Sequence, residues 1–508
     1  MTRPPTPRIV HVLAVAASLC ATAAWVVYER AGLILSHYDA KAHLVVARRV
    51  FDNITPGWQQ IGAVWLPLPH LINLLPVQVD FFYRTGVFAS LVSVVCLGVT
   101  AWAAARLVLV ATGSLVGGAI AIALLATNPN LLYLYATPMT EPLFLAVTFV
   151  ALLWLFEWLQ QGQDDVSWRL GAALFAAAWS RYEAWPILAA AIAAAGYTVW
   201  RRTGSLGAAV RGTLRLSAWP IAAGIIFMIN SRITVGSWFV TDGFYVPDPT
   251  YQRQMTRTLL GIWWGTHQLS GYAIEIVALT AAVVSVISAA RRATASWLVP
   301  ASLFAAASLP AYAFYSGHPY RIRYMVPLVA ACAVWGGIGV GLAGRRSRIA
   351  GAIVAATLLA SIAIESPPWK AHPPMLEEAE WDLPDSHRRE AVTACLAGQY
   401  HGEKVLASMG SLAHYMQELS RSGFHLADFI NEGNGVIWQT AMQTGPAAHA
   451  GWMLVEEQAE GGDVLAKRIA SDAGFARRME RICEGGGVAL YRRVTPFPSF
   501  TDRTGSHP

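Results

Sequence analysis

The chain has 508 residues, of which 55% are hydrophobic and only 13% are charged. Soluble domains usually carry about 25% charged residues, so the composition argues against an ordinary soluble enzyme. The 20 Trp, 17 Tyr and 18 Phe residues exclude intrinsic disorder. The net charge of +6 comes from arginines that stand singly or in pairs between apolar runs, which argues against a nucleic-acid partner.

Charge divides the chain into two parts. Residues 1–365 contain 24 Lys and Arg against 13 Asp and Glu, whereas residues 366–508 contain 13 against 18. The first part has the composition of a basic membrane protein, and the second that of a mildly acidic soluble domain. We therefore predict a membrane module over 1–365 and a separate domain over 366–508.

Eleven apolar runs in the first part are long enough, or nearly so, to cross a membrane, which takes roughly 20 residues. The count holds to within one or two, because the run 168–179 is short and the run 259–290 is long enough to be tilted or broken. The runs are 9–28, 82–105, 110–127, 142–159, 168–179, 184–200, 214–230, 259–290, 297–314, 324–343 and 349–364.

Arginines gather at one alternating set of loop ends, for example Arg201 with Arg202 and Arg345 with Arg346. Lys and Arg in short loops favour the cytoplasmic side, so we predict that this set is cytoplasmic. The N-terminus then lies inside, and residues 366–508 lie outside the plasma (inner) membrane, in the periplasm. No convincing cleavage site follows the first apolar run, which we interpret as a retained helix.

The predicted exterior face holds a long first loop, 29–81, and the C-terminal domain. Two stretches of the loop, 38–51 and 61–75, mix apolar residues with His, Arg and Trp, as helices lying in the membrane interface would. In the C-terminal domain, patterning predicts strands at 405–409, 452–455 and 488–491 and helices at 388–396 and 412–421, hence a small α/β domain.

The cysteines predict one disulfide and no metal. Cys395 and Cys483 both fall in the predicted exterior domain, where an oxidising environment lets them pair. The chain has no CxxC motif and no Cys/His spacing typical of zinc, so we predict no metal site and no cofactor.

The first group of candidate residues directly follows the first apolar run. Asp39 and His43 are one helical turn apart and share a face, and Lys41 lies between them. A carboxylate at this depth could act as a general base, with Lys41 and His43 beside it in a substrate cavity. The alternative is that Asp39 caps a helix.

A second group combines aromatic and polar side chains at predicted outer turns. Trp65 and His70 fit the wall of a sugar site, or else an aromatic belt at the interface. Glu141 and the pair Arg181 and Glu183 lie at the predicted edge of the membrane, where ionisable residues are functional candidates. For the latter pair the alternative is a mutual or neighbouring ion pair.

The strongest local signal is the stretch 318–327, in which Arg321 and Arg323 break the rule that positive charges stay inside. Guanidinium groups bind phosphate in a bidentate manner, so these arginines predict an anionic lipid head group as the ligand. His318 and Tyr324 are lesser candidates for the same site. The alternative is ordinary snorkelling of both arginines to membrane lipids.

These features together resemble the GT-C glycosyltransferases, in particular the protein mannosyltransferases and the lipid A aminoarabinose transferases of the family 39 type. The resemblance covers residues 1 to about 365 and rests on an Asp shortly after helix one, the first-loop helices, and the Arg-Tyr…Pro motif before a late helix. It implies a GT-C-like fold for the membrane module. With the apolar runs and the C-terminal patterning described above, we predict a mainly α, polytopic fold of about 11 spans with a C-terminal exterior α/β domain.

The resemblance also implies roles for individual residues. Asp39 would be the catalytic residue at the acceptor, and Arg321, Arg323 and Tyr324 would lie near the phosphate of a polyprenyl-phosphate sugar donor, with His318 and Arg181 in support. The mannosyltransferases carry an Asp-Glu pair at this position of the loop, whereas Asp39 is followed by Ala40. This departure weakens the case for a protein hydroxyl, and the acceptor stays open between a lipid, a glycan and a protein.

The sequence therefore predicts an inverting glycosyltransferase, a hexosyl, pentosyl or mannosyl transferase, that acts at the outer face of the membrane. Two other classes stay open as alternatives. A secondary transporter would show repeated halves with matched broken helices, and none is found. A membrane-anchored scaffold with an exterior binding domain would not need arginines on the outer face.

Overall fold

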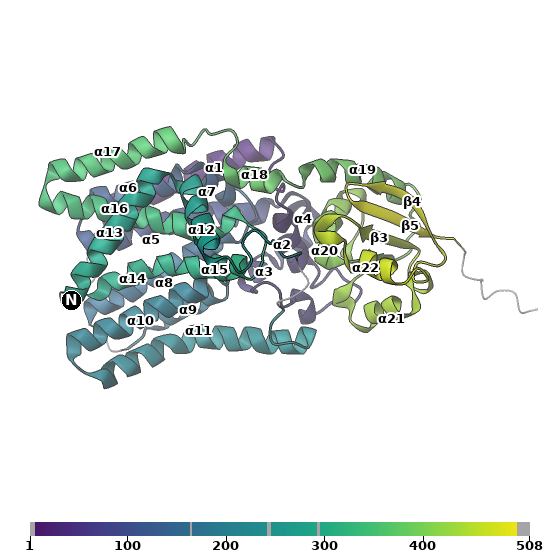
Figure 1. The fold of residues 1–508 in the computed structure, drawn as a ribbon, viewed down its shortest axis with the longest axis horizontal. Helices are drawn as coiled ribbons and strands as arrows, with labels where there is room; N and C mark the ends of the chain where they lie inside the picture. The colour runs from purple at the N-terminus through teal and green to yellow at the C-terminus, as the bar shows by residue number, and fades with distance from the viewer. Residues whose placement is uncertain (1–5, 163–164, 241–244, 292–294, 495–508) are drawn as a thin grey trace, which may run out of the picture.

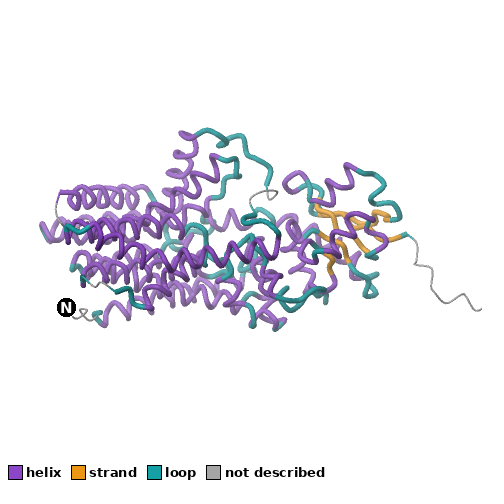
Figure 2. The backbone as a smooth tube through the Cα atoms, turned by 90° about the horizontal axis from the view of Figure 1, so that it is seen from below, coloured by secondary structure: helices purple, strands orange, loops and turns teal. Residues whose placement is uncertain are grey.

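The computed structural model describes residues 6–162, 165–240, 245–291 and 295–494. Long helices form a bundle at one end of the molecule, and a small sheet with its covering helices lies at the other end (Figure 1). Short helices lie between these two parts. The view from below shows the same division, with all drawn strands at one end (Figure 2).

Eight helices of the described chain are long and apolar enough to cross a membrane, or nine if one bent pair counts as a span. Large apolar side chains such as Val12, Val15 and Leu19 are exposed on them, as expected for lipid contact. The spans are α1 (Arg8–Arg30), α5 (Val87–Thr112), α8 (Glu141–Gln161), α11 (Leu206–Val235), α13 (Tyr272–Arg291), the segment Leu298–Tyr315, α16 (Val326–Arg346) with the turn before it, and α17 (Arg348–Glu365).

All eleven predicted runs are largely helical, and the smaller number of spans has local causes. Helix α9 (Trp168–Ala178) has only 11 residues, about 16 Å at 1.5 Å per residue, and cannot cross a core of about 30 Å. Helix α10 (Ala184–Thr203) has 20 residues but ends in Arg201 and Arg202. The run 259–290 still gives one span, α13, because Gly271, with a φ of +97°, ends α12 (Met255–Ser270) before α13 begins.

The bent pair consists of α6 (Leu115–Ala126) and α7 (Pro129–Tyr135), which meet at 69°. Pro129 has no N–H to continue the hydrogen bonds of α6, so a new helix starts there. The Asn128 side chain caps it by accepting from the N–H groups of Asn130 at 2.9 Å and Leu131 at 3.1 Å. Helix α7 therefore leaves the axis of α6 and runs in a new direction.

The first exterior loop departs from the two interfacial helices that we predicted. Helix α2 (Tyr38–Arg48) forms, but ten of its 11 residues are buried, because helices of both parts of the molecule cover it. The second helix is only α3 (Leu68–Asn73), since Gly62 and Pro67 interrupt the stretch before it. The other helices of the loop are η1 (Trp58–Ile61), η2 (Pro76–Gln78) and α4 (Asp80–Thr85).

The C-terminal part contains a five-stranded sheet in the order β2-β1-β3-β5-β4. Strand β1 pairs in parallel with β2 and β3, whereas β5 pairs antiparallel with β3 and β4. The strands are β1 (Val405–Ala407), β2 (Phe429–Ile430), β3 (Trp452–Glu456), β4 (Met479–Gly485) and β5 (Val488–Arg493). The helices are α18 (Pro374–Glu380), α19 (Leu383–Ala397), α20 (Met409–Leu419), α21 (Val436–Thr444) and α22 (Val464–Ser471).

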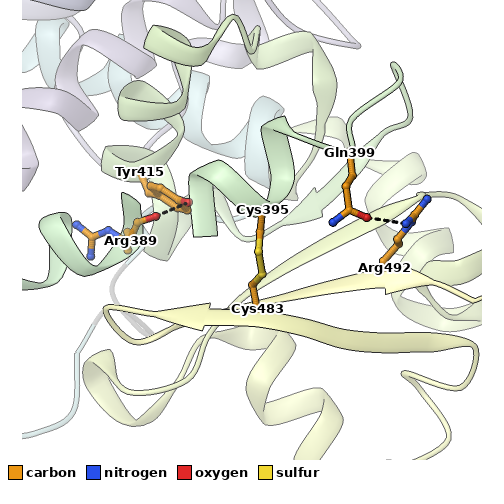
Figure 3. Close-up of a disulfide and its surroundings, with 6 residues drawn as sticks. All are labelled: Arg389, Cys395, Gln399, Tyr415, Cys483 and Arg492. Atoms are coloured by element: carbon orange, nitrogen blue, oxygen red, sulfur yellow. Dashed lines mark hydrogen bonds between the residues drawn. A yellow bond between two sulfur atoms is a disulfide. The ribbon is translucent and has the colours of Figure 1, made fainter. Parts of the chain in front are cut away.

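A disulfide joins Cys395 of α19 to Cys483 of β4, with 6.6 Å between the two Cα atoms (Figure 3). The predicted pairing is therefore confirmed. It ties α19 to the edge strand of the sheet, and α19 in turn follows the segment that leads out of the membrane bundle. Beside it, the Thr393 and Tyr415 hydroxyls are 3.0 Å apart, and Arg492 donates to Gln399 at 2.7 Å.

Candidate active site

The candidate site begins at the first turn of α2, where Asp39 faces inward. The N–H of Asp39 donates to His37 Nδ1 at 3.1 Å, so His37 provides the helix cap. The Asp39 carboxylate instead binds Arg323, with 2.5 Å between Oδ2 and Nη2. The alternative interpretation of Asp39 as a helix cap is therefore wrong.

Arg323 lies in the turn η5 (Ile322–Met325) that precedes α16, and only 7% of it is exposed. Besides Asp39 it contacts His37, with 3.2 Å between Nη1 and Nε2. A guanidinium that is buried among these partners does not extend to the head groups of the surrounding membrane lipids, so snorkelling is wrong for Arg323. Tyr324 lies beside it, with its ring 5.8 Å from the guanidinium carbon and its hydroxyl 3.2 Å from His318 Nε2.

Glu378 completes this group and was not among the predicted residues. It comes from α18, beyond the last long helix, and its Oε2 accepts from the N–H of Ile322 at 2.6 Å. Its Oε1 lies 3.8 Å from both Arg323 Nε and His37 Nε2. Three segments far apart in sequence thus meet at Arg323. We call Asp39, His37, Arg323 and Glu378 the Arg323 cluster.

Electrostatics keep Asp39 ionised. Burial alone would raise the pKa of this carboxyl, but the adjacent Arg323 guanidinium, with His37 and His43, outweighs burial and holds the pKa well below its usual range. A carboxylate stabilised in this way is charged at neutral pH but is a weak base for as long as Arg323 stays bound to it.

Arg321 differs from its neighbour. It is partly exposed, and its guanidinium has no hydrogen bond or ion pair with any residue that the structure describes. It nevertheless stands close enough to Glu378 to affect the pKa of that carboxyl. Burial would raise this pKa, whereas His37, Arg323 and, more weakly, Arg321 lower it. Arg321 is therefore the arginine of the stretch 318–327 that can take an anionic ligand without giving up a partner.

A second group surrounds Arg181 between α9 and α10. Its Nη2 lies 2.6 Å from Glu183 Oε1, its Nη1 lies 3.1 Å from Glu141 Oε1, and Nη1 also donates to the Thr140 hydroxyl at 2.7 Å. The ion-pair alternative for Arg181 and Glu183 is confirmed. We call Arg181, Glu141, Glu183 and Thr140 the Arg181 cluster.

Two histidines and a tryptophan stand between the clusters. His43 Nδ1 lies 3.1 Å from His70 Nε2, and the Trp65 ring packs against His43 at a tilt of 52°, with centroids 4.4 Å apart. The charges of Asp39, Arg181 and Arg323 all act on the pKa of His43, so the two clusters are adjacent. Burial, and next the charge of Arg49, lower the pKa of His70 to about 3.

A cavity of about 20 Å³ lies against His43, between the loop 29–81 and the bundle. It has room for a single water molecule. His43, Asn73, Ser93 and Thr140 are the polar residues of its otherwise apolar wall. Of the predicted site residues in the first loop, His43 alone lines this space.

Lys41 turns away from this space. It binds Glu418 on α20, so it joins α2 to the C-terminal domain. Glu418 also accepts from Ser386 and stands 3.8 Å from Arg389. The structure therefore separates Lys41 from the other candidates of the first loop. Among the residues described, no group of three or more His, Cys, Asp or Glu could hold a metal ion.

Comparison with known proteins places the fold. No protein-family model matches the chain, and no curated protein matches it by sequence. It is similar to the crystal structure of ArnT from Cupriavidus metallidurans bound to undecaprenyl phosphate, with a TM-score of 0.51 and 12% identity over 94% of this chain and 97% of that one. The chain has a GT-C-like fold. The resemblance seen in the sequence and the predicted fold class are confirmed.

Within this GT-C-like fold, most predicted site residues come together and a few do not. Asp39, Arg323, Tyr324 and His318 form one continuous group, whereas Lys41 belongs to a domain contact. Sequence reasoning missed Glu378 because it lies in an acidic stretch, 377–380, whose three glutamates differ only in what surrounds them. His37 was visible in the sequence beside Asp39, but its role as a cap required the structure.

Proposed function

We propose that the protein is an inverting glycosyltransferase that moves a sugar from a polyprenyl-phosphate donor to an acceptor hydroxyl. The observation that carries the proposal is the buried Asp39–Arg323 pair with the unpaired Arg321 beside it, at one end of a GT-C-like bundle. A neighbour of this fold was solved with undecaprenyl phosphate bound, which supports a lipid of this class as the donor carrier.

The residues divide the chemistry between base and counter-charge. The acceptor oxygen forms a bond to the anomeric carbon, the bond from that carbon to the phosphate oxygen breaks, and the anomeric centre inverts. The hydroxyl proton goes to Asp39, and the polyprenyl phosphate leaves with its negative charge. Arg321 meets that charge first, because its guanidinium has no hydrogen bond or ion pair to give up among the described residues.

Arg323 links donor binding to the basicity of Asp39. While Arg323 holds Asp39, the carboxylate is a weak base. A donor phosphate beside Arg321 attracts the Arg323 guanidinium, and each step of Arg323 away from Asp39 raises the proton affinity of that carboxylate. In this scheme Asp39 becomes a strong base only when the donor is bound, so a site without donor does not deprotonate the acceptor.

The proposal includes the membrane orientation and a broad acceptor class. The arginine-rich loop ends favour a cytoplasmic N-terminus, and the Cys395–Cys483 disulfide favours an oxidising exterior compartment for the C-terminal domain. The sugar is a hexose or pentose, mannose included, and the acceptor is a lipid, glycan or protein. A reporter that is active only in the cytoplasm should stay inactive when fused after residue 366.

The direct test uses the purified full chain in lipid nanodiscs. A panel of radiolabelled polyprenyl-phosphate sugars is incubated with lipid, glycan and protein fractions of a bacterial envelope, and release of polyprenyl phosphate is followed. We expect transfer from at least one donor with inversion at the anomeric carbon. If no donor of the panel is bound or consumed, the proposed function is wrong.

A further inference from the structure

The segment after the last long helix passes across the candidate site and is held there by the membrane bundle. The N–H of Met375 in α18 donates to Asn130 Oδ1 of α7 at 3.1 Å. Met375, Leu376 and Ala379 are buried, and α18 packs on α7, α12 and η5. The position of α18 therefore follows from the bundle itself, independently of the sheet of the exterior domain.

In this position, Glu378 has one carboxylate oxygen without a hydrogen bond close to Arg323. Its Oε2 is satisfied by the N–H of Ile322, but its buried Oε1 has no hydrogen bond in the described chain. Arg323 Nε, 3.8 Å away, is also buried and unsatisfied. Buried polar atoms left unpaired are costly, and a shift of about 1 Å would bring these two within the usual hydrogen-bond distance.

His37 strengthens the arrangement. Its Nδ1 accepts from the N–H of Asp39, so a single ring proton must reside on Nε2. That nitrogen faces the Nη1 group of Arg323, which is itself a donor, and stands 3.8 Å from Glu378 Oε1. Glu378 Oε1 is thus the acceptor nearest to two donors. Burial alone would raise the pKa of Glu378, but His37, Arg323 and Arg321 hold it below its usual range, so it stays ionised at neutral pH.

We propose that Glu378 is a positioning residue that holds the Nε side of Arg323 while the Nη groups move from Asp39 to the donor phosphate. The idea rests on the proposed function. A guanidinium presents five donors in a fixed fork, so one edge can stay bound while the other changes partner. With Glu378 in place, Arg323 never stands unpaired in a buried site. Asp39 is then left free to take the acceptor proton.

The test compares two glutamates of the same helix. Glu378→Gln keeps an oxygen that can accept from the N–H of Ile322 but removes the charge that attracts Arg323. Glu377 is exposed one position earlier, so Glu377→Gln is the matched control. Both are made in the full chain in nanodiscs, and two quantities are measured: kcat for sugar transfer, and the Kd of sugar-free polyprenyl phosphate.

In Glu378→Gln, kcat should change while the Kd of polyprenyl phosphate does not rise. We expect kcat to fall by about tenfold or more, the effect of one charge-assisted contact. The Kd should stay equal or fall, because a negative charge near the phosphate is gone. Glu377→Gln should change neither by more than about twofold. Glu378→Asp, which restores the charge, should recover most of kcat and serves as the second variant if Glu378→Gln is not recovered folded.

Each outcome decides something. If Glu378→Gln behaves like Glu377→Gln while the parent transfers sugar, only the role of Glu378 is overturned. If kcat falls and Kd rises together with a lower melting temperature, Glu378 is structural and the proposal is also overturned. If the parent itself transfers no sugar from any polyprenyl-phosphate donor, the proposed function fails, and the role of Glu378 fails with it.

Discussion

Arg181 and Arg323 both stand at the end of the bundle that contacts the loop 29–81, and the residues around them come from different parts of the chain. Arg181 binds Glu141 and Glu183, which lie at neighbouring helix turns of the bundle. Arg323 binds Asp39 of the first loop and stands close to Glu378 of the C-terminal segment. The Arg181 cluster can form within the bundle alone, whereas the Arg323 cluster requires three distant segments.

In the proposed function, this difference separates a stabilising site from a reactive one. Glu183 and Thr140 accept from Arg181, and Glu141 Oε1 lies 3.1 Å from it, although neither buried carboxylate oxygen of Glu141 has a hydrogen bond among the described residues. Arg323 has one strong partner, Asp39, and one unsatisfied donor, Nε, toward a second, Glu378. A buried group with two available partners can change between them, and reactive sites need such alternatives. The predictions below test whether the two clusters differ in this way.

The largest effect is expected from Asp39→Asn. The amide oxygen still accepts from Arg323, so the pair keeps one hydrogen bond, but an amide does not take a proton at neutral pH. We predict that transfer falls by about 10²-fold or more, the usual value of acid–base catalysis. Transfer is measured per folded protein, and donor binding serves as the control because it should be retained.

If Asp39→Asn transfers within a few-fold of the parent, the Arg323 cluster is structural like its neighbour. The catalytic carboxylate would then have to be sought at Glu141 or Glu183. That outcome would also remove the difference between the two clusters.

The second effect is on donor binding. Arg321→Ala removes a guanidinium that has no hydrogen bond or ion pair among the described residues, so the melting temperature should change little. One charge-assisted contact to phosphate is worth about 1.5–3 kcal/mol, so the Kd for polyprenyl phosphate should rise roughly ten- to a hundredfold. Arg323→Ala should weaken donor binding too, but it also leaves Asp39 buried and unpaired. If both single variants bind donor as tightly as the parent, neither arginine holds the phosphate.

The sequence predicted the local features of this comparison and missed the distant ones. The sequence left a mutual or neighbouring ion pair open as the alternative for Arg181 and Glu183, and this local pair forms. Apolar runs in the sequence also marked β1, β3 and β5. Strand β4 is charged and partly exposed at the sheet edge, and β2 has two residues, so neither shows a pattern. Asp39 and Arg323 were each proposed, but their pairing depends on how the bundle folds.

The third prediction concerns the Arg181 cluster. Glu183 is 3% exposed, and Glu183→Gln leaves Arg181 with fewer charges to balance it. Breaking a buried ion pair costs about 3–5 kcal/mol, so the melting temperature should fall clearly. Transfer per folded protein should stay within a few-fold of the parent, since Arg181 and Glu183 are not expected to touch the reacting atoms. A loss of transfer as large as that of Asp39→Asn at unchanged stability would make the Arg181 cluster the reactive one.

The fourth prediction tests how far the Arg323 cluster depends on the exterior domain. Cys395→Ser removes the bond that ties α19 to β4 across 88 residues of sequence. Losing such a disulfide costs about 2–5 kcal/mol. Because α18 is anchored on the bundle, transfer at low temperature should persist while the melting temperature falls. A reducing agent should lower the melting temperature of the parent but not that of the variant. Loss of transfer at low temperature would show that the sheet, and not the bundle, positions Glu378.

The smallest effect comes from a histidine where the exterior domain meets α2. His414 on α20 is mostly buried, 3.7 Å from Asp382. Burial lowers the pKa of His414 to about 4, with Arg389 and Lys41 adding to the decrease and Asp382 opposing it. The folded protein therefore binds a proton here less readily than the unfolded chain, whose His pKa is about 6.5. The contribution of neutral His414 to the free energy of unfolding is then fully present above about pH 6.5. It is lost as the pH falls from about 6.5 toward 4, by at most about 1.4 kcal/mol per pH unit.

His414→Gln should reduce this loss, so its melting temperature should fall less than that of the parent between pH 7.5 and 5. Parallel curves for parent and variant would mean that His414 takes up its proton as readily in the folded protein as in the unfolded chain. The contact between α2 and the exterior domain would then be looser than the pairing of Lys41 with Glu418 indicates.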